Sequence, residues 1–176
     1  MPESGPDEQA LANIRVIALD VDGVLTDGGF WWGANGEELK RFCFADVMGL
    51  SLARRAGFVL AVISGEDSPL VDRYAEKMLI KHVVKGCRDK AAALRQLSSQ
   101  IAIGLKEFCF MGDDINDIPA MQIAGISFAP ANAVPIVRAH VQFVTKSSGG
   151  NGAVRELVDA LLASQGLDPQ ETLKKK

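Results

Sequence analysis

The stretch that decides the fold reads Val16-Ile17-Ala18-Leu19-Asp20-Val21-Asp22-Gly23-Val24-Leu25-Thr26. Its first four residues are all apolar, which predicts a buried strand. Two carboxylates, Asp20 and Asp22, follow at the C-terminal end of that strand. Like charges this close are costly to bury unless a cation or a shared proton compensates them. Asp-Gly after a strand is also ordinary turn chemistry, so this stretch alone leaves a functional site and a plain turn equally open.

Strands and helices alternate along the rest of the chain. Further strands are expected at 58–63, 82–84, 108–111, 126–129 and 143–145. Helices are expected at 47–56, from 68, at 90–97, from about 116 and at 153–163. This alternation predicts an α/β fold, a Rossmann-like three-layer α/β/α arrangement around one parallel sheet. The length fits a single domain over residues 1–176, in which residues 167–176 are expected to form a frayed, flexible polar tail.

An aromatic segment interrupts the alternation after the first strand. Phe30-Trp31-Trp32, a turn at 33–37 and the stretch from Leu39 to Phe44 predict a β-hairpin inserted over residues 28–45. A hairpin that carries so many aromatic side chains is too apolar to stand alone in water. Two arrangements remain open: the aromatics pack between subunits, or they fold back onto the core of their own chain.

Composition excludes several classes of function. The net charge of −3 gives no broad basic face for nucleic acid or an anionic membrane. Residues 1–8 lack the basic and apolar regions of a secretory leader, and no apolar run reaches membrane-spanning length, so a cytoplasmic protein is expected. Three widely spaced cysteines argue against a disulfide framework or a zinc site. Two histidines are too few for a histidine-rich dinuclear metal centre.

Polar residues follow the C-terminal ends of successive expected strands. They are Asp20 and Asp22, Ser64 and Gly65, Lys90, and then Asp113, Asp114, Asn116 and Asp117. Open parallel sheets bind ligands at this edge, so residues far apart in sequence are expected to meet there. Clustered carboxylates suit Mg²⁺, while a hydroxyl and a lysine suit a phosphoryl group. Each residue alone has an ordinary interpretation as a turn former, helix cap or solvated charge, but their joint order favours a phosphoryl-transfer site.

These residues resemble the four motifs of the haloacid dehalogenase superfamily: Asp20 to Thr26, Ser64, Lys90 and Gly112-Asp113-Asp114-Ile115-Asn116-Asp117. More narrowly, the chain resembles the superfamily's capless phosphatases of 3-deoxy-D-manno-octulosonate (KDO) 8-phosphate and related nonulosonate 9-phosphates. The features that carry this second resemblance are Leu25-Thr26-Asp27-Gly28, the aromatic hairpin, Gly86 to Lys90 and Gly149 to Glu156. The resemblance implies a phosphatase with Mg²⁺ as cofactor and no cap domain, acting in cell-surface sugar biosynthesis.

The resemblance also implies a role for each site residue. Asp20 would be the nucleophile that forms an aspartyl phosphate, and Asp22 would be the general acid and base. Mg²⁺ would be held by Asp20, Asp113 and the backbone carbonyl of Asp22. The phosphate would contact Ser64, Gly65 and Lys90, and the supporting residues would be Asp114, Asn116 and Asp117.

Substrate identity is open between eight and nine carbons. Octulosonate enzymes usually carry arginine after the Ser/Thr-Gly pair, where this chain has Glu66. Glu66 with Lys77 resembles the enzyme acting on 2-keto-3-deoxynonulosonate (KDN) 9-phosphate, although the arginine expected with them is replaced by Tyr74, with Arg73 alongside. Arg155, in the glycine-rich segment Gly149–Glu156, is a candidate anion contact. Solvated helix charges and a mobile loop are the ordinary alternatives.

The expected partner is a small sugar-acid phosphate, with no nucleic acid and no membrane. By resemblance, the hairpins pack together in a homotetramer in which a neighbour covers each active site. Other classes are a weakly catalytic oligomerisation module of a sialate or KDO pathway, a phosphatase of another small sugar phosphate, and a response-regulator receiver. The retained acidic residues argue against the module. The receiver is disfavoured because the strand at 82–84 ends without an aspartate and Lys90 precedes Asp113.

Overall fold

The computed structural model describes residues 8–175, so residues 1–7, on which the expected lack of a secretory leader depends, and Lys176 lie outside it. Its centre is a six-stranded parallel sheet in the order β5-β4-β1-β6-β7-β8. The strands are β1 (Val16–Leu19), β4 (Val59–Ile63), β5 (His82–Val84), β6 (Phe108–Met111), β7 (Ile126–Ala129) and β8 (Phe143–Val144). All six expected strands are therefore present, and the expected parallel sheet is confirmed.

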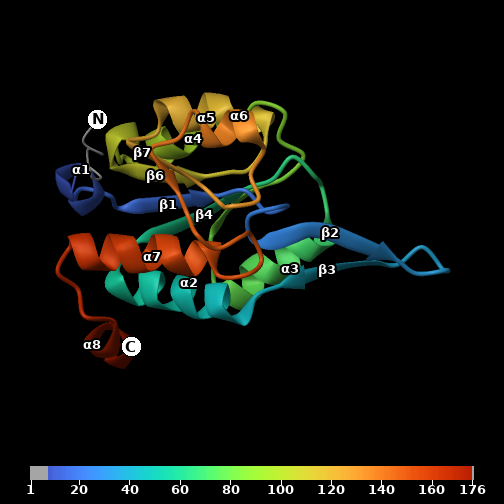
Figure 1. Ribbon diagram of the computed structural model, residues 1–176, viewed down its shortest axis with the longest axis horizontal. Helices are drawn as coiled ribbons and strands as arrows, with labels where there is room; N and C mark the ends of the chain where they lie inside the picture. The colour runs from blue at the N-terminus through green and yellow to red at the C-terminus, as the bar shows by residue number, and fades with distance from the viewer. Residues whose placement is uncertain (1–7, 176) are drawn as a thin grey trace.

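Helices cover both faces of the sheet, as the three-layer prediction requires (Figure 1). One face carries α2 (Phe44–Ala56), α3 (Pro69–Met78) and α7 (Ala153–Ser164), with the short α1 (Glu8–Ala12) beside α7. The other face carries α4 (Lys90–Ile101), α5 (Ile118–Ile123) and α6 (Pro135–Arg138), with short 3-10 turns η1 (Leu105–Glu107) and η2 (Ile115–Asp117). Within residues 8–175, no helix is both long and apolar enough to cross a membrane.

The central strand explains why the sheet needs two covering layers. Ile17 and Leu19 of β1 join the core shared with α2 and α7, whereas Val16 and Ala18 join the core on the opposite face. A strand buried on both sides reads as a continuous apolar run. Leu19 pairs in register with β4 and with β6, so the carboxyl ends of these three strands meet at one edge. The loops that follow β1, β4 and β6 therefore all begin at this edge of the sheet.

Two helix starts differ from the expected ones. Helix α2 begins at Phe44 rather than Val47, so Phe44 opens a helix instead of ending a strand. The helix expected from about Asn116 begins with the 3-10 turn η2, because Asp114 and Asp117 bind the backbone N–H groups at its start. Gly57 ends α2 with φ +98°, a conformation that favours glycine, as its sequence position predicts.

The aromatic segment forms a hairpin of β2 (Thr26–Trp32) and β3 (Glu38–Phe42), which projects away from the main sheet (Figure 1). Its aromatic side chains divide into two groups. Phe42 stacks on Tyr74 of α3, with ring centroids 4.2 Å apart. Trp31, Trp32 and Phe44 remain largely exposed in the single chain, at 53%, 72% and 75%. Packing between subunits stays a prediction for Trp31, Trp32 and Phe44, whereas Phe42 folds back onto its own core.

The expectation of a flexible tail at 167–176 is wrong for the residues described. Residues Pro169–Lys174 form a short helix, α8, which contacts α2. Asp168 caps this helix by accepting hydrogen bonds from the backbone N–H groups of Gln170 and Glu171. Thr172 is buried, and the Arg55 side chain donates to the carbonyls of Leu173 and Lys175. Capping and docking on α2 order a segment that looked polar and frayed.

Candidate active site

The loop after β1 is held in a tight turn that presents its two carboxylates. The Asp20 backbone N–H donates to the Met111 carbonyl at 3.0 Å, which ties the loop to β6. The buried Thr26 hydroxyl accepts from the N–H groups of Gly23 and Gly28, each at 3.2 Å. Gly23 has φ +85°, and a Cβ there would lie 2.0 Å from Oδ2 of Asp113. Glycine therefore lets the loop after β1 pass directly against Asp113.

Lys90 joins two of the acidic residues. Its Nζ lies 2.8 Å from Oδ1 of Asp20 and 2.6 Å from Oδ1 of Asp117, and the lysine itself is buried. The other oxygen of Asp117, Oδ2, accepts hydrogen bonds from the backbone N–H groups of Asp113 and Asp114. Asp117 therefore fixes both the lysine and the loop after β6, which explains why this acidic residue is fully buried.

The acidic cluster fits a divalent cation. Asp20, Asp113 and Asp117 each offer a carboxylate oxygen, and these oxygens all lie within 4.8 Å of one another. Burial, reinforced by the charges of Asp20 and Asp117, raises the pKa of Asp113 to about 7. Burial and the charge of Asp117 also raise the pKa of Asp20, against the opposing effect of Lys90. One lysine leaves this cluster short of positive charge, and hard oxygen donors are the ligands that Mg²⁺ prefers.

A cavity of 300 Å³ opens over this cluster at the carboxyl edge of the sheet. It is lined by Asp20, Asp22, Gly28, Gly65, Glu66, Lys90, Asp113, Asp114 and Asn116. The structure thus brings together residues from four strand ends that the sequence analysis singled out separately. Ser64 lies buried beneath the lining, where its hydroxyl accepts the Glu66 backbone N–H at 3.1 Å.

Lys40 of β3, in the hairpin, contacts two of the residues that line this cavity. Its Nζ lies 2.8 Å from Oδ1 of Asp22 and 2.6 Å from Oε2 of Glu66. Although burial works to lower the pKa of Lys40, hydrogen bonds to Asp22 and Glu66 raise it above its ordinary value. The side chain is therefore an ammonium at neutral pH. Lys40 was not among the predicted site residues, because nothing in the hairpin sequence shows which strand face meets the loop after β1.

The candidate selectivity residues are not gathered in one place. Glu66 lines the cavity, whereas Arg73 and Lys77 lie exposed on α3, outside the lining residues that the structure describes. Tyr74 is buried against Phe42 and does not take the place of a substrate-binding arginine. The Arg155 side chain binds Asp159 at 2.9 Å. A role in selectivity for Arg73, Lys77 and Arg155 stays a prediction.

The glycine-rich segment 149–156 is anchored rather than loose. The Gly149 N–H donates to Asn132 at 2.6 Å, and the same asparagine donates to the Gly23 carbonyl at 3.0 Å. A Cβ at Gly149 would lie 1.8 Å from that carbonyl oxygen. Buried Asp46 accepts the N–H groups of Gly152 and Arg155. The segment therefore supports the loop after β1 through Asn132, a residue that no sequence pattern had indicated.

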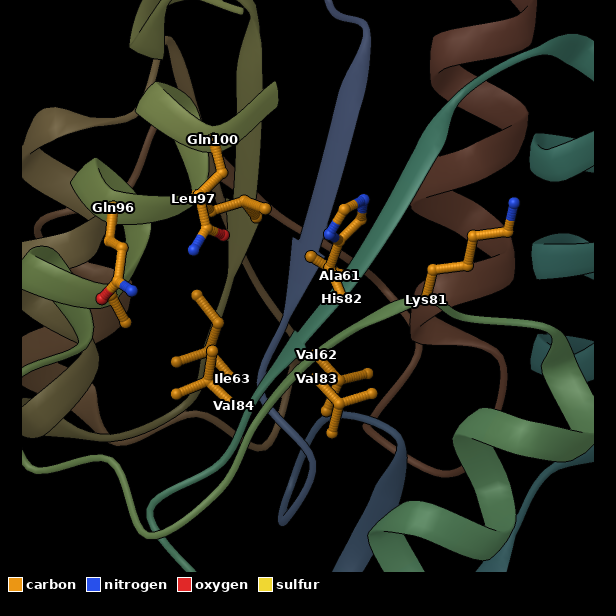
Figure 2. Close-up of a pocket in the computed structure, with 11 residues that line it drawn as sticks. Ala61, Val62, Ile63, Lys81, His82, Val83, Val84, Gln96, Leu97 and Gln100 are labelled. Carbon is orange, nitrogen blue, oxygen red and sulfur yellow. The ribbon is translucent and has the colours of Figure 1, made fainter. Parts of the chain in front are cut away.

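A second cavity, of 310 Å³, lies between α4 and the edge strand β5 (Figure 2). Ile63 and Val84 line it from the sheet, and Gln96 and Gln100 line it from α4 (Figure 2). Among the described residues its lining contains no carboxylate. It therefore lacks the groups that the predicted phosphoryl-transfer chemistry requires.

Comparison with known proteins agrees with this geometry. Residues 71–157 match a family model described as haloacid dehalogenase-like hydrolase. Over 154 residues the chain is 40% identical to the KDO 8-phosphate phosphatase of Escherichia coli strain K12, covering 88% of this chain and 82% of that protein. The chain belongs to the haloacid dehalogenase-like hydrolase family. The resemblance drawn from the sequence motifs is thereby confirmed.

Solved structures of haloacid dehalogenase-like hydrolases share the whole fold. KDO 8-phosphate phosphatase from Moraxella catarrhalis, solved with a magnesium ion, a phosphate ion and a KDO molecule, superposes with a TM-score of 0.88 at 36% identity. The match covers 90% of this chain and 91% of that one. The cobalt-bound phosphatase from Haemophilus influenzae gives a TM-score of 0.87 at 39% identity, covering 90% and 92%. The α/β assignment is therefore confirmed, and the chain is a hydrolase of this family.

Proposed function

We propose that the protein is a Mg²⁺-dependent phosphatase that hydrolyses the phosphate monoester of a 2-keto-3-deoxy sugar acid through an aspartyl phosphate on Asp20. The single observation that carries the proposal is Lys90, buried between Asp20 and Asp117 at the floor of an open cavity. A buried ammonium beside the proposed nucleophile is suited to neutralise charge on a transferred phosphoryl group. The names of the relatives support the same activity.

The reaction has two steps. First, a carboxylate oxygen of Asp20 attacks phosphorus while the bond to the sugar oxygen breaks, and the carboxylic acid of Asp22 gives its proton to that leaving oxygen. Then water attacks phosphorus, and Asp22 takes a proton from the water. Inorganic phosphate leaves, and the Asp20 carboxylate is restored.

Each remaining group of the cavity has a supporting part. Asp20, Asp113 and the backbone carbonyl of Asp22 would hold Mg²⁺, with Asp117 in support. When bound, the cation supplies positive charge that offsets the carboxylates and the phosphoryl oxygens. Ser64 and the Gly65 backbone would contact the phosphoryl group beside Lys90, while Asp114 and Asn116 would border it at the cavity wall.

We propose KDO 8-phosphate as the first substrate to test, because the curated and solved relatives carry that activity in their names. KDN 9-phosphate is the second candidate, and Glu66 in the cavity wall is the observation that favours it. The cavity is open to one side, and the exposed aromatics of the hairpin support assembly into a homotetramer whose neighbouring subunits complete the cover. The cytoplasmic location expected from the sequence remains a prediction.

The test is release of inorganic phosphate from a panel of sugar-acid phosphates, with Asp20→Asn as the background control. We expect turnover of at least one eight- or nine-carbon 2-keto-3-deoxy substrate in Mg²⁺, well above that of simple hexose phosphates. Release no greater than that of Asp20→Asn for every member of the panel would refute the proposed activity.

A further inference from the structure

Lys40 differs from the charged residues that line the cavity because it comes from the hairpin. Side chains alternate between the two faces of a strand, so Glu38, Lys40 and Phe42 share one face of β3. Phe42 on this face packs on Tyr74, which presses the face toward the body of the chain. Leu39, on the opposite face, is 60% exposed. The fold of the hairpin therefore dictates that Lys40 points at the active site.

The contacts of Lys40 restrict it to one position. Its side chain is 2% exposed and lies between Oδ1 of Asp22 at 2.8 Å and Oε2 of Glu66 at 2.6 Å. Glu38 is a third carboxylate, at 3.7 Å. Charge-assisted hydrogen bonds of this length are strong and directional, and a buried ammonium that lost them would be left without compensation. The Lys40 ammonium is therefore held in one position, and its hydrogen bond can orient the Asp22 carboxyl group.

We propose that Lys40 is a positioning residue for Asp22, fixing Oδ1 of that carboxyl group so that Oδ2 is the oxygen that transfers the proton. Among the described residues, Oδ1 takes the Lys40 contact and Oδ2 takes no hydrogen bond. This inference rests on the proposed phosphatase function, in which Asp22 is the acid and base.

The surrounding charges suit a geometric role. Asp22, Glu66 and Glu38 place three carboxylates around one ammonium, so the group keeps an excess of negative charge. Glu66 binds the same ammonium at 2.6 Å, so Lys40 has a second strong contact besides Asp22. Because Lys40 belongs to β3, distortion of the hairpin would misplace the proton-transfer group without touching the nucleophile.

The experiment compares two esters in Lys40→Met and Lys40→Arg. One ester is the best sugar-acid phosphate of the panel, whose alkoxide needs a proton to leave. The other is p-nitrophenyl phosphate, whose phenolate leaves without one, with its first turnover followed by rapid mixing. Lys85→Met is the matched control, because Lys85 also binds two carboxylates, Asp67 at 2.9 Å and Asp72 at 2.6 Å, but neither of these carboxylates lines the cavity.

We expect Lys40→Met to lower kcat on the sugar-acid phosphate by about 10- to 100-fold, a part of what a general acid contributes. We expect its KM to stay within about twofold and its first turnover on p-nitrophenyl phosphate within about threefold, because the leaving phenolate needs no acid. Lys40→Arg should recover part of the lost kcat. Lys85→Met should match the wild type on both esters.

Other outcomes would overturn the inference separately from the phosphatase proposal. An equal loss on both esters would mean that Lys40 supports the fold, and a raised KM with unchanged kcat would mean that it binds substrate. Should Lys40→Met fail to fold, Glu66→Gln, which loosens the lysine while leaving it in place, must show the same split between esters at smaller amplitude. A wild-type protein inactive on every sugar-acid phosphate would instead refute the proposed function itself.

Discussion

The two ends of β2 differ in how their unusual side chains are accommodated: charged side chains are buried near its start, and aromatic side chains are exposed at its end. Beside its start, the acidic cluster is buried, and Lys90 and backbone N–H groups provide partners for Asp20 and Asp117 within one chain. At its tip, Trp31 and Trp32 are exposed. Large exposed aromatic patches mark interaction sites. The groups for the proposed chemistry therefore all come from one chain, whereas the described residues of that chain leave the aromatics at the hairpin tip exposed.

Two residues connect these regions. Phe42 stacks on Tyr74 at the base of the hairpin, and Lys40 binds Asp22, so the position of the hairpin affects the position of the Asp22 carboxyl group. Substitutions in the acidic cluster should therefore stop phosphate-ester hydrolysis and leave the oligomeric state unchanged. Substitutions of the exposed aromatic residues should change the oligomeric state and leave phosphoryl transfer itself unaffected.

The largest effect is expected from changes in the cluster. Asp20→Asn should lower turnover by at least about a thousandfold, because it removes the nucleophile. Asp22→Asn should do the same on sugar-acid phosphates. Circular dichroism and light scattering should match the wild type for both variants, since asparagine fills the same volume and its amide oxygen can still accept a hydrogen bond from the paired lysine. Near wild-type turnover by Asp20→Asn would show that the covalent mechanism is wrong.

Removal of the metal is expected to have the next largest effect. Treatment with a chelator should lower phosphate release by about a hundredfold or more, because the uncompensated carboxylates repel the substrate's phosphate. Added Mg²⁺ should restore the rate, and the oligomeric state should be the same with and without chelator. Full activity after thorough metal removal would rule out the proposed metal site.

The hairpin should give an intermediate effect. Trp31→Gln combined with Phe44→Gln should release monomers, seen by light scattering. Turnover of sugar-acid phosphate should fall by about tenfold because the neighbour's cover is lost, while a small aryl phosphate is hydrolysed as before. Phe42→Ala is the contrast, because it should instead lower the free energy of unfolding of the chain by about 2 kcal/mol. A wild-type monomer with full activity on sugar-acid phosphate would refute a shared active site.

The smallest effect concerns stability in the absence of metal. Burial raises the pKa of Asp113 from 3.8 to about 7 in the folded protein. Because the folded state then binds more protons than the unfolded state, its stability falls as the pH rises between these values. Chemical denaturation with chelator should show a loss on the order of 2 kcal/mol from pH 5 to pH 8. Asp113→Asn should reduce the slope of the curve, since Asp20 also has a raised pKa, and added Mg²⁺ should flatten it; a metal-free protein that gains stability over this range would contradict this account of the cluster.

Much of the cluster could be predicted from sequence because one rule places it. Residues after the carboxyl ends of parallel strands meet at one edge, so Asp20, Lys90 and Asp113 needed only correct strand assignments. Lys40 and Asn132 could not be predicted as site residues. Their partners depend on how a hairpin and a loop pack on the rest of the fold, and no local sequence pattern shows this. Their distances to Asp22 and to Gly23 follow from the whole fold.

The C-terminal segment was misjudged for a different reason. Asp168-Pro169 is a local helix-start signal, an N-cap followed by proline at the first helical position, and it was available in the sequence. The expectation of a frayed tail relied on the polar composition of residues 167–176 and did not use this helix-start signal. Docking of Thr172 on the body of the protein decides the outcome, and such tertiary contacts are not visible in composition.

The central claim is that Asp20 carries the phosphoryl group, and chemical trapping tests it most directly. The enzyme is mixed with its best sugar-acid phosphate in Mg²⁺, quenched and treated with borohydride, which reduces an acyl phosphate to an alcohol. Peptide mass spectrometry then locates the reduced residue. We predict that Asp20 is converted to homoserine only when substrate is present, and that Asp22 and Asp113 are unchanged. Reduction at another residue, or none at Asp20 under conditions of rapid turnover, would contradict the account.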